Sequence, residues 1–458
     1  MGKGRKDTLL SMIREGQDMT VAEQAELALI LSVPAILAQL SSVLMSYIDT
    51  AMVGRLGAQA GASIGLVSTS TWIFGGFCMA ASSGFSVQVA HLLGAKRYEK
   101  ARDVLRKGLA STLIFSLTMA LIAIAISGRL PYWLGGSAEI ARDATSYFAI
   151  YSAFLPAMQI CFGCGAMLQA SGNMKVPATL NIVMCVLDVA LNYLFIYVLG
   201  MGVKGAALGT GVAMALTAAQ MAWTLIVKSP ELNLLQDRGS FIPDRECLRK
   251  AFGITGPMWL QNVISRGAYI AATVIVAPLG TIAIAANTFA ITAESFCYMP
   301  GYGIQDASTT LVGQSLGAGR KSLARRFAWI NISLGAGIMA ALGVLMFLLA
   351  PQMMALLTSD PEVAALGAEV LRIEAFAECL YGASIVAYGC CVGGGDTLVP
   401  SALNLISMWV VRIGLALVLT PKLGLKGYWI AMCVELNVRG LLFLWRIKGD
   451  RWMKHKLT

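Results

Sequence analysis

The chain has 458 residues, of which 57% are hydrophobic and only 13% are charged. Soluble globular proteins carry about 25% charged residues, so this composition excludes an ordinary soluble enzyme or nucleic-acid-binding domain. Lys and Arg (35) outnumber Asp and Glu (25), giving a formal charge of +10. In a chain this apolar, we interpret the excess of cationic residues as a signal of membrane orientation, which depends on where these residues lie along the chain.

Six apolar runs follow a polar tail at residues 1–25 and predict six membrane-spanning helices. A helix needs about 20 residues to cross a bilayer, and each run is at least this long. Gly, Pro or charged clusters separate the runs. Together they form the predicted amino-terminal lobe, residues 26–227. The six helices are predicted at residues 26–53, 62–92, 108–128, 144–171, 176–200 and 203–227.

A polar linker at residues 228–250 separates this lobe from a second set of six apolar runs. The second set forms the predicted carboxyl-terminal lobe, residues 251–446, and a polar tail follows at residues 447–458. The chain is therefore predicted to be an all-α polytopic membrane protein with twelve transmembrane helices. The second six are predicted at residues 251–279, 281–313, 327–350, 364–392, 399–420 and 425–446.

The distribution of Lys and Arg predicts that both termini are cytoplasmic. With that placement, about 25 of the 35 cations fall in cytoplasmic segments and about seven in external loops. An even number of spans agrees with termini on one side. We therefore expect a multi-pass protein of the cell (inner or plasma) membrane.

The two halves of the chain carry an internal repeat with a spacing of 223 residues. Because each copy holds six helices, both copies enter the membrane from the same side. They are then expected to be related by a pseudo-two-fold axis along the membrane normal, with a binding site at their interface. The matching pairs are Pro34 with Pro257, Gly57 with Gly280, Pro177 with Pro400, and Asn181 with Asn404.

Four polar residues of the first half are candidates for a cation site. An ionisable side chain inside a span costs about 2.5–3.5 kcal/mol on insertion scales, and both Asp49 and Asp188 lie within predicted spans. Asn192 lies on the same helix face as Asp188, since residues i and i+4 align, and Thr210 adds a hydroxyl. These oxygens are the type of ligand that hard cations such as Na⁺ prefer, and two carboxylates can also share a proton.

Simpler roles remain open for these residues. Asp49 is close to Gly54 and Arg55 and could only cap a helix end, and Asp188 could only make an interhelical hydrogen bond. Pro34 interrupts the hydrogen-bond ladder of the first helix and serves either as a hinge or as a static kink.

The second half carries a different set of intramembrane charges. Glu435 and Arg439 are spaced as an i,i+4 ion pair. One alternative is that Arg266 forms a buried ion pair with Glu294 or Glu378 and so fixes the lobe. Otherwise Arg266, Glu294, Glu378 and Arg412 line the cavity.

In combination, several motifs over nearly the whole chain resemble those of the multidrug and toxic compound extrusion (MATE) transporters. Besides Pro34 in the first helix and the two six-helix halves, these motifs are Asp49-Thr-Ala-Met-Val-Gly-Arg-Leu-Gly57, Gly172-Asn-Met-Lys-Val-Pro177, Gly202-Val-Lys-Gly-Ala-Ala-Leu-Gly-Thr210, Val312-Gly-Gln-Ser-Leu-Gly-Ala318 and Gly394-Gly-Asp-Thr-Leu-Val-Pro400.

The resemblance implies a V-shaped, two-lobe secondary antiporter that exports drug-like, often cationic or amphipathic compounds as H⁺ or Na⁺ enters. In members with an amino-lobe ion site, an Asp of the first helix works with an Asn and an Asp on the fifth helix and a Thr on the sixth. Asp49 and Thr210 match this pattern directly. Asp188 stands at the place of the Asn and Asn192 at the place of the Asp, which leaves the choice between Na⁺ and H⁺ open.

Two further implications of the resemblance concern the carboxyl lobe and helix bending. Members with a carboxyl-lobe site use acids of the seventh and tenth helices, and those places hold Ser265 and Tyr381 here. We therefore assign coupling to the amino lobe. The family's helix-bending Pro corresponds to Pro34.

A flippase for a lipid-linked precursor, which shares the duplicated architecture, is the alternative function. It would need cationic side chains such as Arg266 and Arg412 to hold pyrophosphate. No nucleophile–base arrangement or metal-ligand spacing supports an enzyme, so we expect none, with no cofactor besides the coupling ion. The expected partners are a small organic substrate and the lipid bilayer, not nucleic acid, and the expected state is a monomer.

Overall fold

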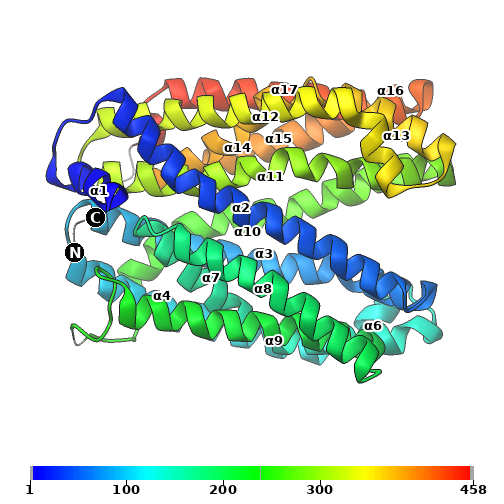
Figure 1. The fold of residues 1–458 in the computed structure, drawn as a ribbon, viewed down its shortest axis with the longest axis horizontal. Helices are drawn as coiled ribbons and strands as arrows, with labels where there is room; N and C mark the ends of the chain where they lie inside the picture. The colour runs from blue at the N-terminus through cyan, green and yellow to red at the C-terminus, as the bar shows by residue number, and fades with distance from the viewer. Residues whose placement is uncertain (1–3, 238, 454–458) are drawn as a thin grey trace. The chain divides into compact units, whose positions relative to one another are not determined.

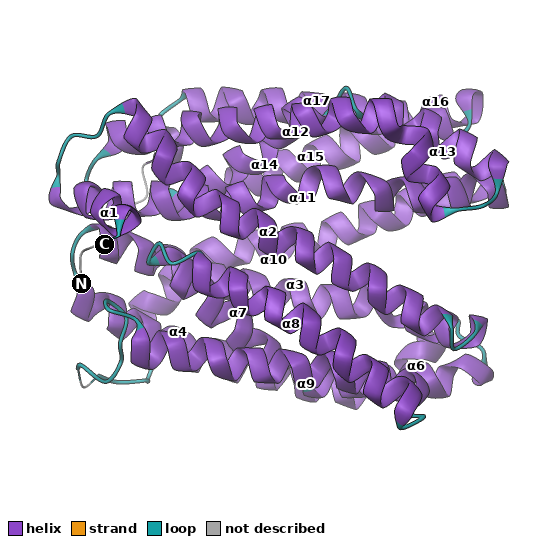
Figure 2. Ribbon diagram, viewed as in Figure 1, coloured by secondary structure: helices purple, strands orange, loops and turns teal. Residues whose placement is uncertain are grey.

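The computed structural model describes residues 4–237 and 239–453, so residues 1–3 and 454–458 of the two predicted tails lie outside the described residues. Helices make up nearly all of this part of the chain, and no strand occurs among the described residues (Figure 2). The loops are short except for the connection between Lys228 and Arg245, which lies in the predicted linker. The predicted all-α fold is confirmed.

The chain divides into two compact units by its internal contacts. The amino unit is formed by residues 41–259, and the carboxyl unit by the residues up to Leu40 together with those from Leu260 onward. The two boundaries fall inside the helices α2 (Val21–Gly54) and α10 (Arg245–Val276). Each of these two long helices therefore contributes its first part to one unit and its second part to the other.

Between its portions of α2 and α10, the amino unit contains seven α-helices (Figure 1). Two single π-helical turns, η1 (Leu194–Val198) and η2 (Thr224–Lys228), continue two of these helices. The seven are α3 (Ala58–Gly94), α4 (Tyr98–Ser127), α5 (Leu130–Trp133), α6 (Ala138–Ala153), α7 (Leu155–Ala170), α8 (Lys175–Tyr193) and α9 (Gly202–Trp223).

The carboxyl unit begins with a short helix, α1 (Arg5–Glu15), whose apolar residues Leu9, Leu10 and Ile13 are buried. The remaining elements of the unit are η3 (Ala277–Leu279), α11 (Thr281–Gly317), α12 (Lys321–Leu357), α13 (Pro361–Glu374), α14 (Glu378–Gly393), α15 (Leu398–Ile406), η4 (Ser407–Ile413), α16 (Gly414–Leu423), α17 (Leu425–Lys448) and η5 (Arg451–Met453).

The helices repeat along the chain as the sequence predicts. Helices α3 and α11 begin at positions 58 and 281, and α7 and α14 begin at positions 155 and 378, the same spacing of 223 residues that separates Pro34 from Pro257. Even the turns correspond: Lys96, whose φ is 57°, occupies the place of Gly319, whose φ is 76°. A left-handed backbone is costly for a residue with a Cβ. The same left-handed turn at Lys96 and Gly319 is therefore a requirement of the fold rather than a preference of the residue.

Nine helices in the described part of the chain are long and apolar enough to cross a membrane, and two bent helix pairs raise this number to eleven. The bent pairs are α6 with α7 (44°) and α13 with α14 (62°). The twelfth predicted span corresponds to α17, which has 24 residues and so a length of about 36 Å. The structure thus supports a multi-pass membrane protein.

Three of the predicted spans differ from the helices of the structure. The predicted span 144–171 is broken at Phe154, two residues before Pro156, which stands in the first turn of α7 and cannot donate a backbone hydrogen bond into the preceding turn. The predicted span 364–392 is likewise broken, between Glu374 and Glu378. The third predicted span, residues 108–128, lies in α4, which begins at Tyr98. The charged first turns of α4 are helical although they are not apolar.

Candidate functional site

The four candidate residues of the first half all belong to the amino unit and come from three helices. Asp49 lies five residues before the end of α2, Asp188 and Asn192 lie in the last two turns of α8, and Thr210 lies in the third turn of α9. Helices α8 and α9 pack along each other. The helical spacing of Asp188 and Asn192 turns both side chains to one face of α8.

Asn192 connects the two carboxylates directly. Its Nδ2 donates a hydrogen bond to Asp49 Oδ1 at 3.0 Å and another to Asp188 Oδ2 at 3.1 Å. Asp188 also interacts with the side chains of Asp49 and Thr210. The structure therefore brings all four residues that the sequence singled out into one cluster.

Burial is greatest on the α8 side of the cluster. Asp188 and Asn192 are each 1% exposed, whereas Asp49 and Thr210 are partly exposed. The cluster thus has a buried side on α8 and a more accessible side at Asp49 and Thr210.

Two oxygens of the cluster are buried and without a hydrogen-bond partner in the described part of the chain: Asp188 Oδ1 and Asn192 Oδ1. A buried polar atom without a partner costs about 1–3 kcal/mol. Both atoms are oxygens, the ligand type of hard cations, and a carboxylate oxygen is also where a proton binds. These side chains therefore fit an added Na⁺ or proton.

The helix-capping alternative for Asp49 does not suit its position. Asp49 lies near the carboxyl-terminal end of α2, which ends at Gly54. That end of a helix carries partial negative charge and favours cations, not carboxylates. The hydrogen bond from Asn192 stabilises the carboxylate of Asp49 instead.

Two residues that the sequence analysis did not select also belong to this site. Gly209 of α9 lies directly against Asn192, and a Cβ at this position would contact the side-chain oxygen of Asn192. Tyr147 of α6 lies within electrostatic range of Asp49 and Asp188. Gly209 stands inside the motif that ends at Thr210, but nothing in the motif distinguishes it from the other glycines. Tyr147 carries no charge and does not stand out by hydropathy.

In the carboxyl unit, Glu435 forms the centre of a buried ion-pair network. Arg412 Nη2 lies 2.7 Å from Glu435 Oε2, and Arg439 Nε donates to Glu435 Oε1 at 2.7 Å. Arg439 Nε also donates to Ser407 Oγ at 3.1 Å. The predicted i,i+4 pair of Glu435 and Arg439 is therefore present, and Arg412, for which no partner was predicted, completes it.

Three more glutamates are buried in the carboxyl unit: Glu294 of α11, Glu374 at the end of α13 and Glu378 at the start of α14. Glu374 lies within electrostatic range of the other two and of Arg412. Both carboxylate oxygens of Glu374 and of Glu378 are buried without a hydrogen-bond partner among the described residues.

Arg266 of α10 lies with its guanidinium carbon 5.7 Å from the centre of the Tyr269 ring, a distance compatible with a cation–π contact. The pairing of Arg266 with Glu294 or Glu378 stays a prediction, as does the role of Pro34, which stands inside α2.

Comparison with known families gives two matches along this chain. The MatE family profile matches residues 34–194 and again residues 257–418. The two matches begin at Pro34 and Pro257, so the repeat found in the sequence corresponds to two copies of one family domain.

The chain is similar over most of its length to curated and solved proteins. It is 26% identical to a probable multidrug resistance protein NorM of Thermotoga maritima, covering 93% of this chain and 92% of that protein. It is 22% identical to the multidrug resistance protein MdtK of Yersinia pestis, covering 95% and 97%. A solved MOP superfamily transporter from Pyrococcus furiosus superposes with a TM-score of 0.89 at 22% identity, covering 97% and 99%, which shows the fold.

Proposed function

Because the chain belongs to the MatE family, we propose that it is a secondary active antiporter that exports drug-like organic compounds in exchange for H⁺ or Na⁺. The names of its relatives, multidrug resistance proteins NorM and MdtK, support this substrate class. Transport requires no covalent chemistry, and we expect no enzymatic activity.

The observation that carries the proposal is the Asn192 bridge between Asp49 and Asp188. Two carboxylates that share one amide donor repel each other when both are charged, and burial strengthens that repulsion. A bound cation removes it. The cluster is therefore built to bind one H⁺ or Na⁺ and to change its packing when that ion leaves.

The position of the cluster on α2 supplies a route from ion binding to conformational change. Asp49 lies on the part of α2 that belongs to the amino unit, and Pro34 lies on the part that belongs to the carboxyl unit. We propose that neutralising the cluster alters the packing of α2, with Pro34 as the hinge. The ion and the substrate must differ in affinity for the two conformations, since only differential affinity shifts an equilibrium.

We propose that Glu294 and Glu378 supply polar groups of the carboxyl unit and that Arg412 has a structural role. Two hydrogen bonds from Arg412 to Glu435 already compensate its charge. Arg412 is then not available to hold a pyrophosphate, which disfavours the flippase alternative. We also propose that a monomer is the transporting unit.

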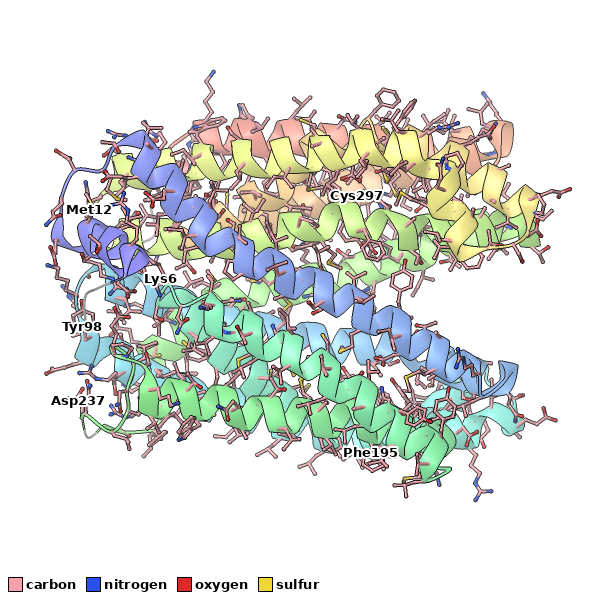
Figure 3. The ribbon with its side chains drawn as sticks, viewed as in Figure 1. Lys6, Met12, Tyr98, Phe195, Asp237 and Cys297 are labelled. Carbon is pink, nitrogen blue, oxygen red and sulfur yellow. The ribbon has the colours of Figure 1, made fainter. Side chains whose placement is uncertain are left out.

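We propose that the protein resides in the cell membrane with both termini in the cytoplasm. The cationic segments support this orientation: Lys96, Arg97 and Lys100 lie at the start of α4, and positively charged loops stay on the cytoplasmic side. Figure 3 shows Tyr98 and Asp237 at the same end of the amino unit and Phe195 at the opposite end.

Ethidium efflux from proteoliposomes tests the proposal. The purified protein is reconstituted, and efflux is measured under an imposed pH gradient or an imposed Na⁺ gradient, each alone. We expect one gradient to drive efflux in the wild type and neither to drive it in Asp49→Asn. Equal efflux with and without both gradients would show that the protein is not a cation-coupled antiporter.

A further inference from the structure

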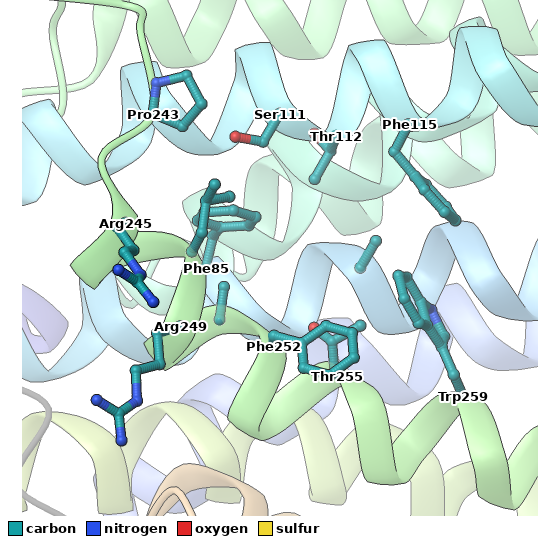
Figure 4. Close-up of a pocket in the computed structure, with 13 residues that line it drawn as sticks. Phe85, Ser111, Thr112, Phe115, Pro243, Arg245, Arg249, Phe252, Thr255 and Trp259 are labelled. Carbon is teal, nitrogen blue, oxygen red and sulfur yellow. The ribbon is translucent and has the colours of Figure 1, made fainter.

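A groove of about 700 Å³ lies in the amino unit, between α3, α4 and the first part of α10. Its walls are mainly aromatic and aliphatic (Figure 4). Phe252 is 63% exposed and Leu248 is 40% exposed, so the groove opens to the outside of the unit. The cation cluster described above contributes no residue to it; the side chains that define it are Phe85, Phe115, Leu248, Phe252 and Trp259, with Arg245 and Arg249.

One end of the groove is a fixed aromatic surface. Trp259 stacks on Phe115 with ring centres 5.0 Å apart and planes 18° from parallel, and it meets Phe252 edge to face. Its Nε1 donates a hydrogen bond to the backbone oxygen of Phe77 at 3.0 Å. The polar atom of the indole is thus satisfied, and the indole contributes an apolar wall.

The hydroxyl groups that line the groove are also satisfied within the protein. Ser111 Oγ donates to Lys107 O at 2.6 Å, Thr112 Oγ1 to Gly108 O at 2.8 Å and Thr255 Oγ1 to Ala80 O at 3.2 Å. A polar ligand would find no donor aimed into this part of the groove. The interior therefore suits a hydrocarbon chain.

The other end of the groove is cationic. Arg245 and Arg249 are one helical turn apart at the start of α10, and Figure 4 shows them together at the end opposite Phe115 and Trp259. Both are exposed, and neither guanidinium has a hydrogen bond or ion pair to another described residue.

The neighbouring acids do not neutralise these two arginines. Asp244 accepts from Lys107 Nζ at 2.5 Å, a nitrogen that also pairs with Asp103 at 2.6 Å, and Glu246 pairs with Lys250 Nζ at 2.9 Å. The hydrogen bond from Lys107 keeps the pKa of Asp244 below its ordinary value, so Asp244 is a carboxylate that is bonded to Lys107. The two guanidinium groups remain available to an external anion.

The segment before the groove has the character of a membrane interface. Phe241 is 55% exposed and Ile242 is 78% exposed, three to four residues before Arg245. Exposed apolar side chains beside cations are typical of segments that lie at the headgroup level of a bilayer. From Arg245 to Trp259 the helix rises about 21 Å, which equals about half of the 40–45 Å bilayer including its headgroups.

We propose that this groove binds one anionic phospholipid, with an acyl chain against Phe115, Phe252 and Trp259 and the charged headgroup at Arg245 and Arg249. A zwitterionic lipid would gain the same apolar contacts but less from the two arginines. A cationic transport substrate would be repelled by them. The groove is therefore a lipid site rather than part of the transport pathway.

Quenching of Trp259 fluorescence by brominated lipids tests the site on the full chain in detergent. Brominated phosphatidylglycerol and brominated phosphatidylcholine are titrated separately, and Trp259→Phe defines the part of the signal that comes from Trp259. With about 1 kcal/mol from each arginine, we expect phosphatidylglycerol to quench at about 30-fold lower concentration than phosphatidylcholine.

The double variant Arg245→Gln/Arg249→Gln should lose this preference while its melting temperature is unchanged. The matched control, Arg97→Gln/Arg326→Gln, removes two exposed arginines outside the groove and should keep the preference. Equal quenching by the two lipids in the wild type would overturn the proposal. So would an unchanged preference in the first double variant, or displacement of phosphatidylglycerol by an equal concentration of inorganic phosphate.

Discussion

Gly209 is the position where the candidate site should be least tolerant of one added methyl group. A Cβ built there lies 2.9 Å from the backbone nitrogen of Asn192 and also contacts its side-chain oxygen. Non-bonded carbon contacts are comfortable at about 3.5–4.0 Å, so Gly209→Ala must move α8 away from α9 by about half an ångström or more. We expect a loss of about 1–3 kcal/mol, the usual cost of overpacking, and displacement of Asn192 from the two carboxylates.

Gly65→Ala is the matched control, because Gly65 also lies in a helix of the amino unit and a Cβ there would meet nothing within 4 Å. Its stability should be unchanged or higher by about 0.5–1 kcal/mol. Thermal unfolding in one detergent and ethidium efflux from proteoliposomes are measured for both variants. If Gly209→Ala melts and transports like the wild type, the close packing of α9 on Asn192 is not what positions the site.

Three further substitutions test separate parts of the structure. Asp49→Asn should abolish efflux-dependent drug tolerance in cells while expression, followed by immunoblot, stays intact; unchanged tolerance would refute its role in coupling. Glu435→Gln should lower stability by about 3–5 kcal/mol, because it leaves Arg412 and Arg439 buried without their anion, and a melting curve like that of the wild type would contradict this. Glu374→Gln removes a buried carboxylate that makes no hydrogen bond in the described part of the chain, so its melting temperature should be unchanged or higher, and a marked drop would show that the carboxylate has an essential partner.

The sequence predicted the duplicated helical fold because hydropathy and helix punctuation are local properties. The spacing between Pro34 and Pro257 recurs in the helix starts and in the two family matches. The sequence also pointed to the four candidate site residues, because polar groups inside a membrane are few and costly. These are Asp49, Asp188, Asn192 and Thr210.

Contacts between helices distant in the chain could not be predicted in the same way. Arg412 and Glu435 meet across two helical segments, and nothing in the pattern around either residue specifies the partner. Gly209 belongs to the site because α9 approaches Asn192 closely at this position. Tyr147 belongs to it through an uncharged side chain near the two carboxylates. A hydropathy pattern carries no information on either kind of contact. The polar first turns of α4 are helical beyond the apolar run, so the run underestimates the length of the helix.

The central claim is that the Asp49–Asp188–Asn192 cluster binds the cation that is exchanged for substrate. The most direct measurement uses proteoliposomes with an imposed ethidium gradient and no imposed cation gradient, in which luminal pH and luminal Na⁺ are followed by entrapped dyes. The account predicts that ethidium flux drives an opposite flux of one of these cations in the wild type and that this counterflux is absent in Asp49→Asn. Ethidium flux without any H⁺ or Na⁺ counterflux, or a counterflux that persists in Asp49→Asn, would contradict it.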